Sequence, residues 1–250
     1  MARQEGSNKL RGRIGDITYY KTKTGYFAKR YTSPVKALQQ TAGWHRSIKT
    51  FANSSNISKN IRDLVSPLTH EYEHRYVYQK LNGLMQRITK TDKINETKYK
   101  KVTFGELGLL KGFEFSKEPK LRNYLHSFPR ISQEGMLLEL NHEVIFSKIP
   151  PSVTHFKMQY HVIMFNETWE FNGLLCLHES DYLPVPKAHH VGDQVSVSMS
   201  VEDILKGVEG PVVGILMCTM EFFDVINGEP NKLYTGSGAG FVSAWRLIKY

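Results

Sequence analysis

The strongest constraint on the fold is the hydropathy pattern of the second half of the chain, where short apolar runs are separated by turn residues. In Gln194–Val201 apolar and polar residues alternate at every position, which predicts a strand with one buried face and one wet face. Asn227-Gly228, between two further apolar runs, predicts a tight hairpin turn. The expected strands are Met136–Leu140, Val144–Phe146, Thr154–Phe165, Phe171–Leu177, Gln194–Val201, Val212–Val225 and Phe241–Ile248. About seven short strands of this kind predict an antiparallel, immunoglobulin-like β-sandwich over residues 107–250.

Residues 33–106 show helical spacing instead. Ser33-Pro34 offers a capping serine followed by a proline at the first helical position. Downstream, apolar residues recur mostly at steps of three and four. Asn53–Asn56 interrupts this stripe and predicts a break, and Ser66-Pro67 predicts a second helix start. The region is therefore expected to hold two or three helices, and the chain as a whole to be α+β.

Residues 1–32 are expected to form an N-terminal arm with a β-hairpin. Ile14–Lys21 is β-branched and aromatic, Thr22–Gly25 supplies turn residues, and Tyr26–Arg30 forms the return strand. A hairpin of this size is marginal alone and must pack on something, in this chain or in another. Its alternating aromatic and basic residues are also suited to a phosphate backbone.

The charge of the chain is divided between its halves. Residues 1–125 hold 25 Lys and Arg against 10 Asp and Glu, a net charge of +15, whereas residues 126–250 hold 8 against 14, a net charge of −6. The basic half is suited to a polyanion such as nucleic acid, or to the acidic half of another copy in a head-to-tail contact. The remaining interpretation is that both halves only solvate their surfaces.

The expected location is cytoplasmic, without membrane contact. Met1–Lys9 lacks the apolar core of a secretory signal, and no window approaches the roughly 18 apolar residues of a membrane span. Release as an extracellular assembly stays open.

The two cysteines, Cys176 and Cys218, both lie in apolar runs that are expected to be strands. In a chain without a signal peptide we expect reduced core cysteines. The alternative is a disulfide between the two sheets of a sandwich, which only the separation of the Cα atoms would decide.

One string has the spacing of a catalytic metal site. His70-Glu71-Tyr72-Glu73-His74 fits the zinc-peptidase pattern H-E-x-x-H, in which two histidines one helical turn apart bind zinc and Glu71 activates a water molecule. The string closely follows the expected helix start, its neighbours are charged, and Glu96, the downstream candidate for a third ligand, lies in a polar segment. We interpret it as a solvated helix face, with a zinc-dependent hydrolase as the residual alternative.

Other candidate motifs carry less chemistry. Gly236–Gly240 lacks the Lys-Ser/Thr of a phosphate-binding P-loop and opens an expected strand. His155 and His161 lie six residues apart in one expected strand, roughly 20 Å along it, and His189-His190 lies in an expected loop. We predict no cofactor and no metal site, and we do not expect an enzyme.

Several segments resemble a family of basic hypothetical proteins common in Bacteroidota. The resemblance covers the opening Lys9–Lys21 with Gly25–Arg30, then Leu109–Phe115 and Pro151–Lys157, and near the end Glu221–Phe223 with Asn227-Gly228, Tyr234 and the closing strand. It spans most of the chain except residues 53–100. It implies no activity, cofactor or catalytic residue.

The sequence therefore predicts a non-enzymatic, self-assembling structural subunit of a filament, tube or phage-derived particle. Its partners would be other copies of itself, reached through the N-terminal arm and head-to-tail charge contacts. The alternative is a nucleic-acid-binding protein that uses the basic N-terminal half. The residues expected to make either contact are Arg11, Arg13, Tyr19, Tyr20, Lys21, Lys23, Tyr26, Lys29 and Arg30.

Overall fold

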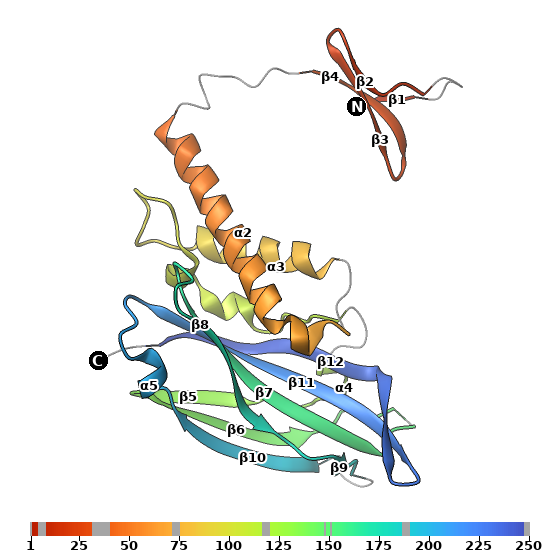
Figure 1. Cartoon of the computed structure of the whole chain (residues 1–250), viewed down its shortest axis with the longest axis vertical. Coiled ribbons are helices and arrows are strands. Elements are labelled where there is room, and N and C mark those ends of the chain that lie inside the picture. The colour runs from red at the N-terminus through yellow and green to blue at the C-terminus, as the bar shows by residue number, and fades with distance from the viewer. Residues whose placement is uncertain are drawn as a thin grey trace. The chain divides into compact units, whose positions relative to one another are not determined.

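The computed structural model describes residues 2–4, 9–31, 41–71, 76–116, 121–147, 149–150, 152–186 and 191–247 (Figure 1). The chain forms two compact units, Met1–His45 and Arg46–Tyr250. Both units contain β-strands, and the longer helices lie between the N-terminal strands and the remaining strands in the sequence. The α+β class predicted from the sequence is confirmed.

The first unit holds a four-stranded antiparallel sheet with the strand order β1-β4-β3-β2. Strands β3 (Ile17–Thr22) and β4 (Gly25–Arg30) form the predicted hairpin, with Thr22 opposite Gly25. Two strands that the sequence pattern did not predict, β1 (Ala2–Arg3) and β2 (Gly12–Ile14), pair with the outer sides of this hairpin. Both are too short to show an alternating pattern.

The second unit contains two antiparallel sheets. The smaller sheet has the order β10-β6-β5, and the larger has the order β12-β11-β7-β8, with β9 also pairing with β7. The strands are β5 (Arg130–Glu134), β6 (Leu137–Ile145), β7 (His155–Asn166), β8 (Asn172–Glu179), β9 (Leu183–Pro184), β10 (Val191–Ser200), β11 (Val212–Ile226) and β12 (Glu229–Leu247).

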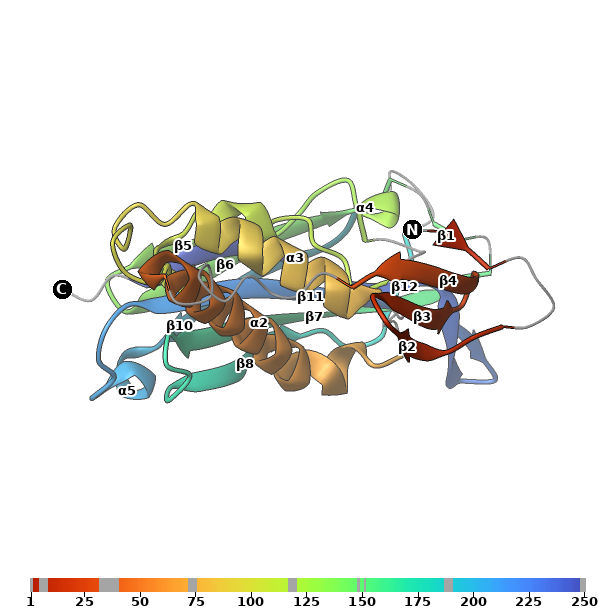
Figure 2. The same ribbon diagram turned by 90° about the horizontal axis from the view of Figure 1, so that it is seen from above.

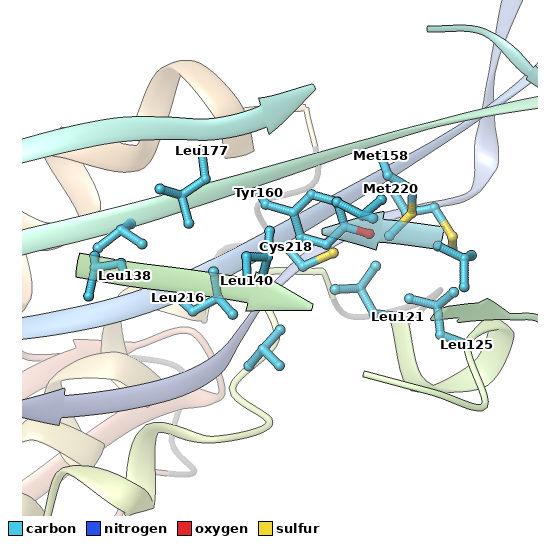
Figure 3. Packing of buried hydrophobic residues seen from close by; sticks show 14 of the residues in the cluster. Leu121, Leu125, Leu138, Leu140, Met158, Tyr160, Leu177, Leu216, Cys218 and Met220 are labelled. Atoms are coloured by element: carbon cyan, nitrogen blue, oxygen red, sulfur yellow. The ribbon is translucent and has the colours of Figure 1, made fainter. Parts of the chain in front are cut away.

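One hydrophobic cluster lies between these two sheets. Leu138 and Leu140 of β6 meet Tyr160 of β7 and Cys218 of β11, and all four are buried (Figure 3). The predicted alternation in β10 is confirmed, because Val195 is buried in this cluster while the flanking Gln194 and Ser196 are exposed.

A second cluster covers the opposite face of the larger sheet. The long helices α2 (Ala42–Thr69) and α3 (Val77–Lys90) lie over β7 and β11, as Figures 1 and 2 show. The short helices η1 (Val102–Phe104) and η2 (Leu107–Leu110) add to this layer, whereas α4 (Leu121–Tyr124) and α5 (Glu202–Leu205) contribute to the first cluster. Strands β7 and β11 are therefore covered on both faces, which explains their nearly continuous apolar sequences.

The predicted break at Asn53–Asn56 is wrong, because α2 runs through it without interruption. The polar side chains of this stretch find partners outside the helix or along it. Asn53 donates to the carboxylate of Glu167, and the hydroxyl of Ser54 donates to the carbonyl of Phe51 over 3.0 Å. Asn53 is thus bonded outside the helix, and the Ser54 hydroxyl bonds back to a carbonyl of the same helix without ending it.

The predicted helix start at Ser66-Pro67 is also wrong. Pro67 lies in the last turn of α2, which ends at Thr69, and α3 begins only at Val77. Proline near a helix end is consistent with the helix stopping soon after it. The other predicted start, Ser33-Pro34, lies outside the described residues.

Two predicted strands, Met136–Leu140 and Val144–Phe146, are largely one strand, β6. Polar residues separate the two apolar runs, but His142 is buried within the strand and its Nδ1 atom lies 2.7 Å from the hydroxyl of Tyr160. The predicted turn at Asn227-Gly228 is confirmed, since both residues have positive φ and join β11 to β12.

The cysteine prediction is half right. Both cysteines are free, but only Cys218 is buried, whereas Cys176 is exposed. A disulfide between two sheets is contradicted, because β8 and β11, which carry them, belong to the same sheet and flank β7 on its two sides.

Candidate assembly interface

The nine residues predicted to make contacts lie on the N-terminal sheet, but they do not share one face. Cross-strand register places Lys21 opposite Tyr26, and places Tyr20 opposite Phe27 one step along. Successive residues of a strand point to opposite faces. Tyr19, Lys21, Tyr26 and Arg30 therefore lie on one face, whereas Arg13, Tyr20 and Lys29 lie on the other; Lys23 lies in the β3–β4 turn, and Arg11 directly precedes β2.

Tyr26 is surrounded by cations. The Nζ atoms of Lys21 and Lys9 lie 5.5 Å and 5.9 Å from its ring centroid, and the guanidinium carbon of Arg11 lies 5.7 Å from it. A hydrogen bond from Arg11, with further effects of Lys21, lowers the pKa of the Tyr26 phenol. Three like charges gathered around one ring form a strongly electropositive site.

The opposite face carries two further cation–aromatic pairs. The rings of Tyr20 and Phe27 stack with centroids 6.1 Å apart, and the Nζ atom of Lys29 lies 5.8 Å from the Tyr20 centroid. At the end of the sheet the guanidinium carbon of Arg13 lies 3.7 Å from the centroid of Tyr31. Both faces of the sheet therefore combine aromatic rings with positive charge.

The cations of this sheet have no acidic partner among the described residues. Among the described residues of this unit, Lys9, Arg11, Arg13, Lys21 and Lys29 form no ion pair with a carboxylate. Their positive charge is thus not neutralised within the described chain.

The sheet also buries none of its described side chains, although several are apolar. Ile14 and Ile17, which are cross-strand neighbours, are 58 % and 40 % exposed. The described buried residues all lie beyond residue 53. This unit thus has no described core of its own.

Sequence reasoning missed two members of this surface, Lys9 and Tyr31. Both lie outside the predicted hairpin, and they contact a ring and a cation of the sheet, Tyr26 and Arg13 respectively. The backbone N–H of Tyr31 also donates to the carbonyl of Asp16 over 2.6 Å. A local pattern gives no signal for contacts of this kind.

The structure gives Glu71 of the H-E-x-x-H string a different role. Its carboxylate pairs with Lys232 of β12, which also pairs with Glu221 of β11 at 2.5 Å. This hydrogen-bonded pairing with Lys232 lowers the pKa of Glu71. His74 lies outside the described residues, and no group of three potential metal ligands occurs among those that are described.

A second group of polar side chains, Ser127, His142 and Tyr160, resembles a catalytic triad in its spacing. The Nε2 atom of His142 lies 3.2 Å from the hydroxyl of Ser127, its Nδ1 atom contacts Tyr160, and Ser127 and His142 line a cavity of about 850 Å³. The Ser127 hydroxyl, however, donates to the carbonyl of Glu143 over 2.5 Å and accepts from the N–H of Ile145 over 2.9 Å. With its one proton used, it can only accept from Nε2–H.

That hydrogen-bond pattern fixes the state of the imidazole. Nε2 carries the proton and Nδ1 accepts from Tyr160, so His142 presents no lone pair to the Ser127 hydroxyl. Burial lowers the pKa of His142 to about 4, which keeps the ring neutral at pH 7. The arrangement links two strands and a loop and does not activate a nucleophile.

The remaining sequence candidates are dispersed. His155 begins β7, whereas His161 is buried in the middle of the same strand, opposite Cys176. The glycine cluster lies inside β12, where Gly240 allows close approach: a Cβ there would lie 2.8 Å from the carbonyl oxygen of Phe113. His189-His190 lies outside the described residues.

No helix in the described ranges has the length and apolar character needed to cross a membrane. Neither a protein-family model nor a curated protein matches the chain.

Proposed function

We propose that this chain is a non-enzymatic structural subunit that assembles with other copies of itself through its N-terminal sheet. The observation that carries the proposal is a four-stranded sheet with no buried described side chain and with Ile14 and Ile17 exposed. A small sheet becomes stable in water only when its apolar face is covered. A surface of another subunit is a suitable cover.

Charge supports another copy as the partner. The cations of the N-terminal sheet have no described ion pairs, while residues 126–250 carry a net charge of −6. Contact between the basic region of one copy and the acidic region of the next is heterologous. Such contacts generate a ring where the rotation closes and an open filament or tube where it does not.

Sedimentation velocity of the full chain, over a range of protein and salt concentrations, tests this proposal. We expect species larger than the monomer that grow with protein concentration and dissociate at high salt. Ile14→Ser/Ile17→Ser should weaken the association, because it removes apolar surface and no charge.

The matched control is Ile226→Ser, which replaces an isoleucine that is 55 % exposed at the end of β11, far from the N-terminal sheet in sequence. It should assemble like the unmodified chain. A chain that stays monomeric at high concentration and low salt would refute self-assembly.

The cluster around Tyr26 favours one second candidate, a nucleic-acid-binding protein. Its three cations and half-buried ring combine the charge and the aromatic surface that bind single strands. This function predicts that affinity for a single-stranded oligonucleotide falls steeply with salt.

Fluorescence anisotropy with a labelled oligonucleotide separates the two candidates. Tyr26→Ala should cost about 1–3 kcal/mol of binding free energy if bases stack on the ring. The control Tyr182→Ala removes an exposed tyrosine of the second unit and should leave binding unchanged. The absence of binding at low salt would exclude this candidate.

The finer architecture of the second unit is also a proposal. We infer an immunoglobulin-like sandwich because the strands divide into β5, β6 and β10 on one side and β7, β8, β11 and β12 on the other. Two neighbouring pairs, β10 with β6 and β11 with β7, are distant in sequence, as in Greek-key connections. Without the two-residue strand β9, the division into three and four strands matches the seven strands of a constant-type domain.

A further inference from the structure

An apolar stripe on the first half of α2 is exposed. Ile48 and Phe51 are 47 % and 56 % exposed, and Trp44, one turn earlier in the same helix, is 43 % exposed. Their spacing of four and three residues places all three on one side of the helix. Large apolar side chains at this spacing are typical of a helix face that packs against protein.

The same helix side is already a packing surface further along. Seven residues after Ile48, the Ser55 hydroxyl lies 3.0 Å from the side-chain oxygen of Asn82 on α3. Seven residues later again, the guanidinium of Arg62 lies 4.9 Å from the ring centroid of Tyr78, also on α3. Because positions seven apart lie on the same side of a helix, the exposed stripe continues the face that α3 covers.

The surroundings of the stripe are basic. The sequence contains no Asp or Glu from residue 17 to residue 62, a range that includes Arg46 and Lys49 beside the stripe. The stripe of a second copy would bring these cations face to face, which is unfavourable. An acidic surface avoids that repulsion.

We infer that the Ile48–Phe51 face of α2 is a second assembly surface, which docks on the acidic β-region, residues 126–250, of a neighbouring copy. The inference rests on the proposed self-assembly and names a further contact within it. The apolar residues supply the buried contact, and the cations at its rim meet the carboxylates of the neighbour. The contact is heterologous and extends the assembly beyond two copies.

The test compares the full chain with Ile48→Ser/Phe51→Ser by sedimentation velocity. The double substitution should raise the apparent dissociation constant about tenfold or more, since it removes two central apolar contacts. Lys49→Glu should weaken association at low salt and much less at high salt. Melting temperatures measured alongside should stay close to that of the unmodified chain, because the replaced residues are exposed.

Two control variants match these changes. Leu109→Ser replaces a leucine that is 39 % exposed in η2, and Lys111→Glu makes the same charge change at an exposed lysine two residues later. Both should assemble like the unmodified chain.

The outcomes separate this inference from the proposed function. If Ile14→Ser/Ile17→Ser reduces association and Ile48→Ser/Phe51→Ser does not, the N-terminal sheet is the assembly contact and the α2 surface is refuted. Association that stops at a closed dimer would overturn the head-to-tail contact. A monomeric unmodified chain would overturn both proposals.

Discussion

The Nδ1 atom of His142 lies 2.7 Å from the hydroxyl oxygen of Tyr160, inside the cluster between the two sheets of the second unit. Both residues are buried, and the imidazole is held neutral because Tyr160 donates to Nδ1 while Nε2–H donates to Ser127. A protonated ring would lose the bond from Tyr160 and would carry its charge within an apolar core.

Protein stability should therefore fall as the solution becomes acidic. Burial lowers the pKa of His142 from 6.5 to about 4, so between these values the unfolded chain binds more protons than the folded chain. The unfolding free energy then rises with pH across this window, and His142 alone accounts for a loss of about 3 kcal/mol on going from pH 7 to pH 4.

Urea unfolding at pH 7 and pH 4 measures this loss. Comparison with His142→Gln subtracts the contribution of the other titrating groups to the pH dependence. The variant should be less stable at pH 7 but should lose about 3 kcal/mol less on acidification. His126→Gln replaces an exposed histidine near the same cavity and should behave like the unmodified chain. Identical pH dependence in His142→Gln and the unmodified chain would contradict the buried neutral ring.

The ion pair between Glu71 and Lys232 gives a second prediction. Glu71→Gln should lower the unfolding free energy by about 1 kcal/mol at low salt, because both side chains are partly exposed and the pair is screened. The loss should shrink in 1 M NaCl. The pKa of Glu71 is lower in the folded chain than in the unfolded chain. The ion pair therefore stabilises the fold at pH values above the unfolded-state pKa, and this contribution is lost as the pH falls through the folded-state pKa.

Thermal unfolding with and without added zinc completes this test, with Glu106→Gln as a control at an exposed carboxylate. The ion-pair role predicts no zinc-dependent stabilisation. Zinc-dependent hydrolysis that disappears in Glu71→Gln would instead restore the metalloprotease interpretation.

Local patterns predicted the elements whose signal lies within a few residues. The β3–β4 hairpin and the Asn227-Gly228 turn follow from turn chemistry, and β10 follows from its alternation. Two of the errors arose where a partner distant in sequence forms a hydrogen bond with a polar residue. Asn53 is held by Glu167, and His142 by Tyr160, so neither ends its element.

For the candidate interface too, the sequence predicted local features and missed those that depend on distant contacts. Composition identified the basic and aromatic residues of the N-terminal sheet, but only strand register shows which residues of β3 and β4 share a face, such as Lys21 and Tyr26. The two short edge strands carry too few residues for any periodicity. The exposure of Ile48 and Phe51 depends on tertiary packing, which helical spacing alone does not reveal.

Asp92 provides a third prediction, because it organises the loop after α3. Its Oδ1 atom accepts from the N–H groups of Ile94 and Asn95, and its Oδ2 atom accepts from the N–H of Lys101 and the side chain of Asn95, at 2.8–3.1 Å. In Asp92→Asn an NH₂ group replaces one carboxylate oxygen. It would face the two N–H groups that this oxygen accepts from, and those two hydrogen bonds would be lost. We expect a loss of about 2–3 kcal/mol in unfolding free energy.

Chemical denaturation measures the effect of Asp92→Asn. The control is Glu96→Gln, an exposed change in the same loop, which should change the unfolding free energy by less than about 0.5 kcal/mol. Burial raises the pKa of Asp92, but the hydrogen bonds from Lys101, Asn95 and Ile94 outweigh it and lower the pKa. Its contribution is therefore present above its unfolded pKa and is lost below it. Equal stability of the two variants would show that the loop does not depend on Asp92.

The contact of Gly105 with α3 gives the last prediction. Gly105 follows η1 and passes so close to the helix end that a Cβ atom there would lie 2.2 Å from the carbonyl oxygen of Ile88. Neither the Cβ atom nor the carbonyl oxygen can rotate away, because each is attached directly to the backbone. Gly105→Ala therefore requires η1 to move away from α3. Such overpacking should lower the unfolding free energy by about 3 kcal/mol.

Gly108→Ala, three residues along, meets nothing within 4 Å and is the matched control. Differential scanning calorimetry should show a lower Tm for Gly105→Ala alone, and an unchanged Tm in that variant would mean that η1 does not pack as closely on α3 as described.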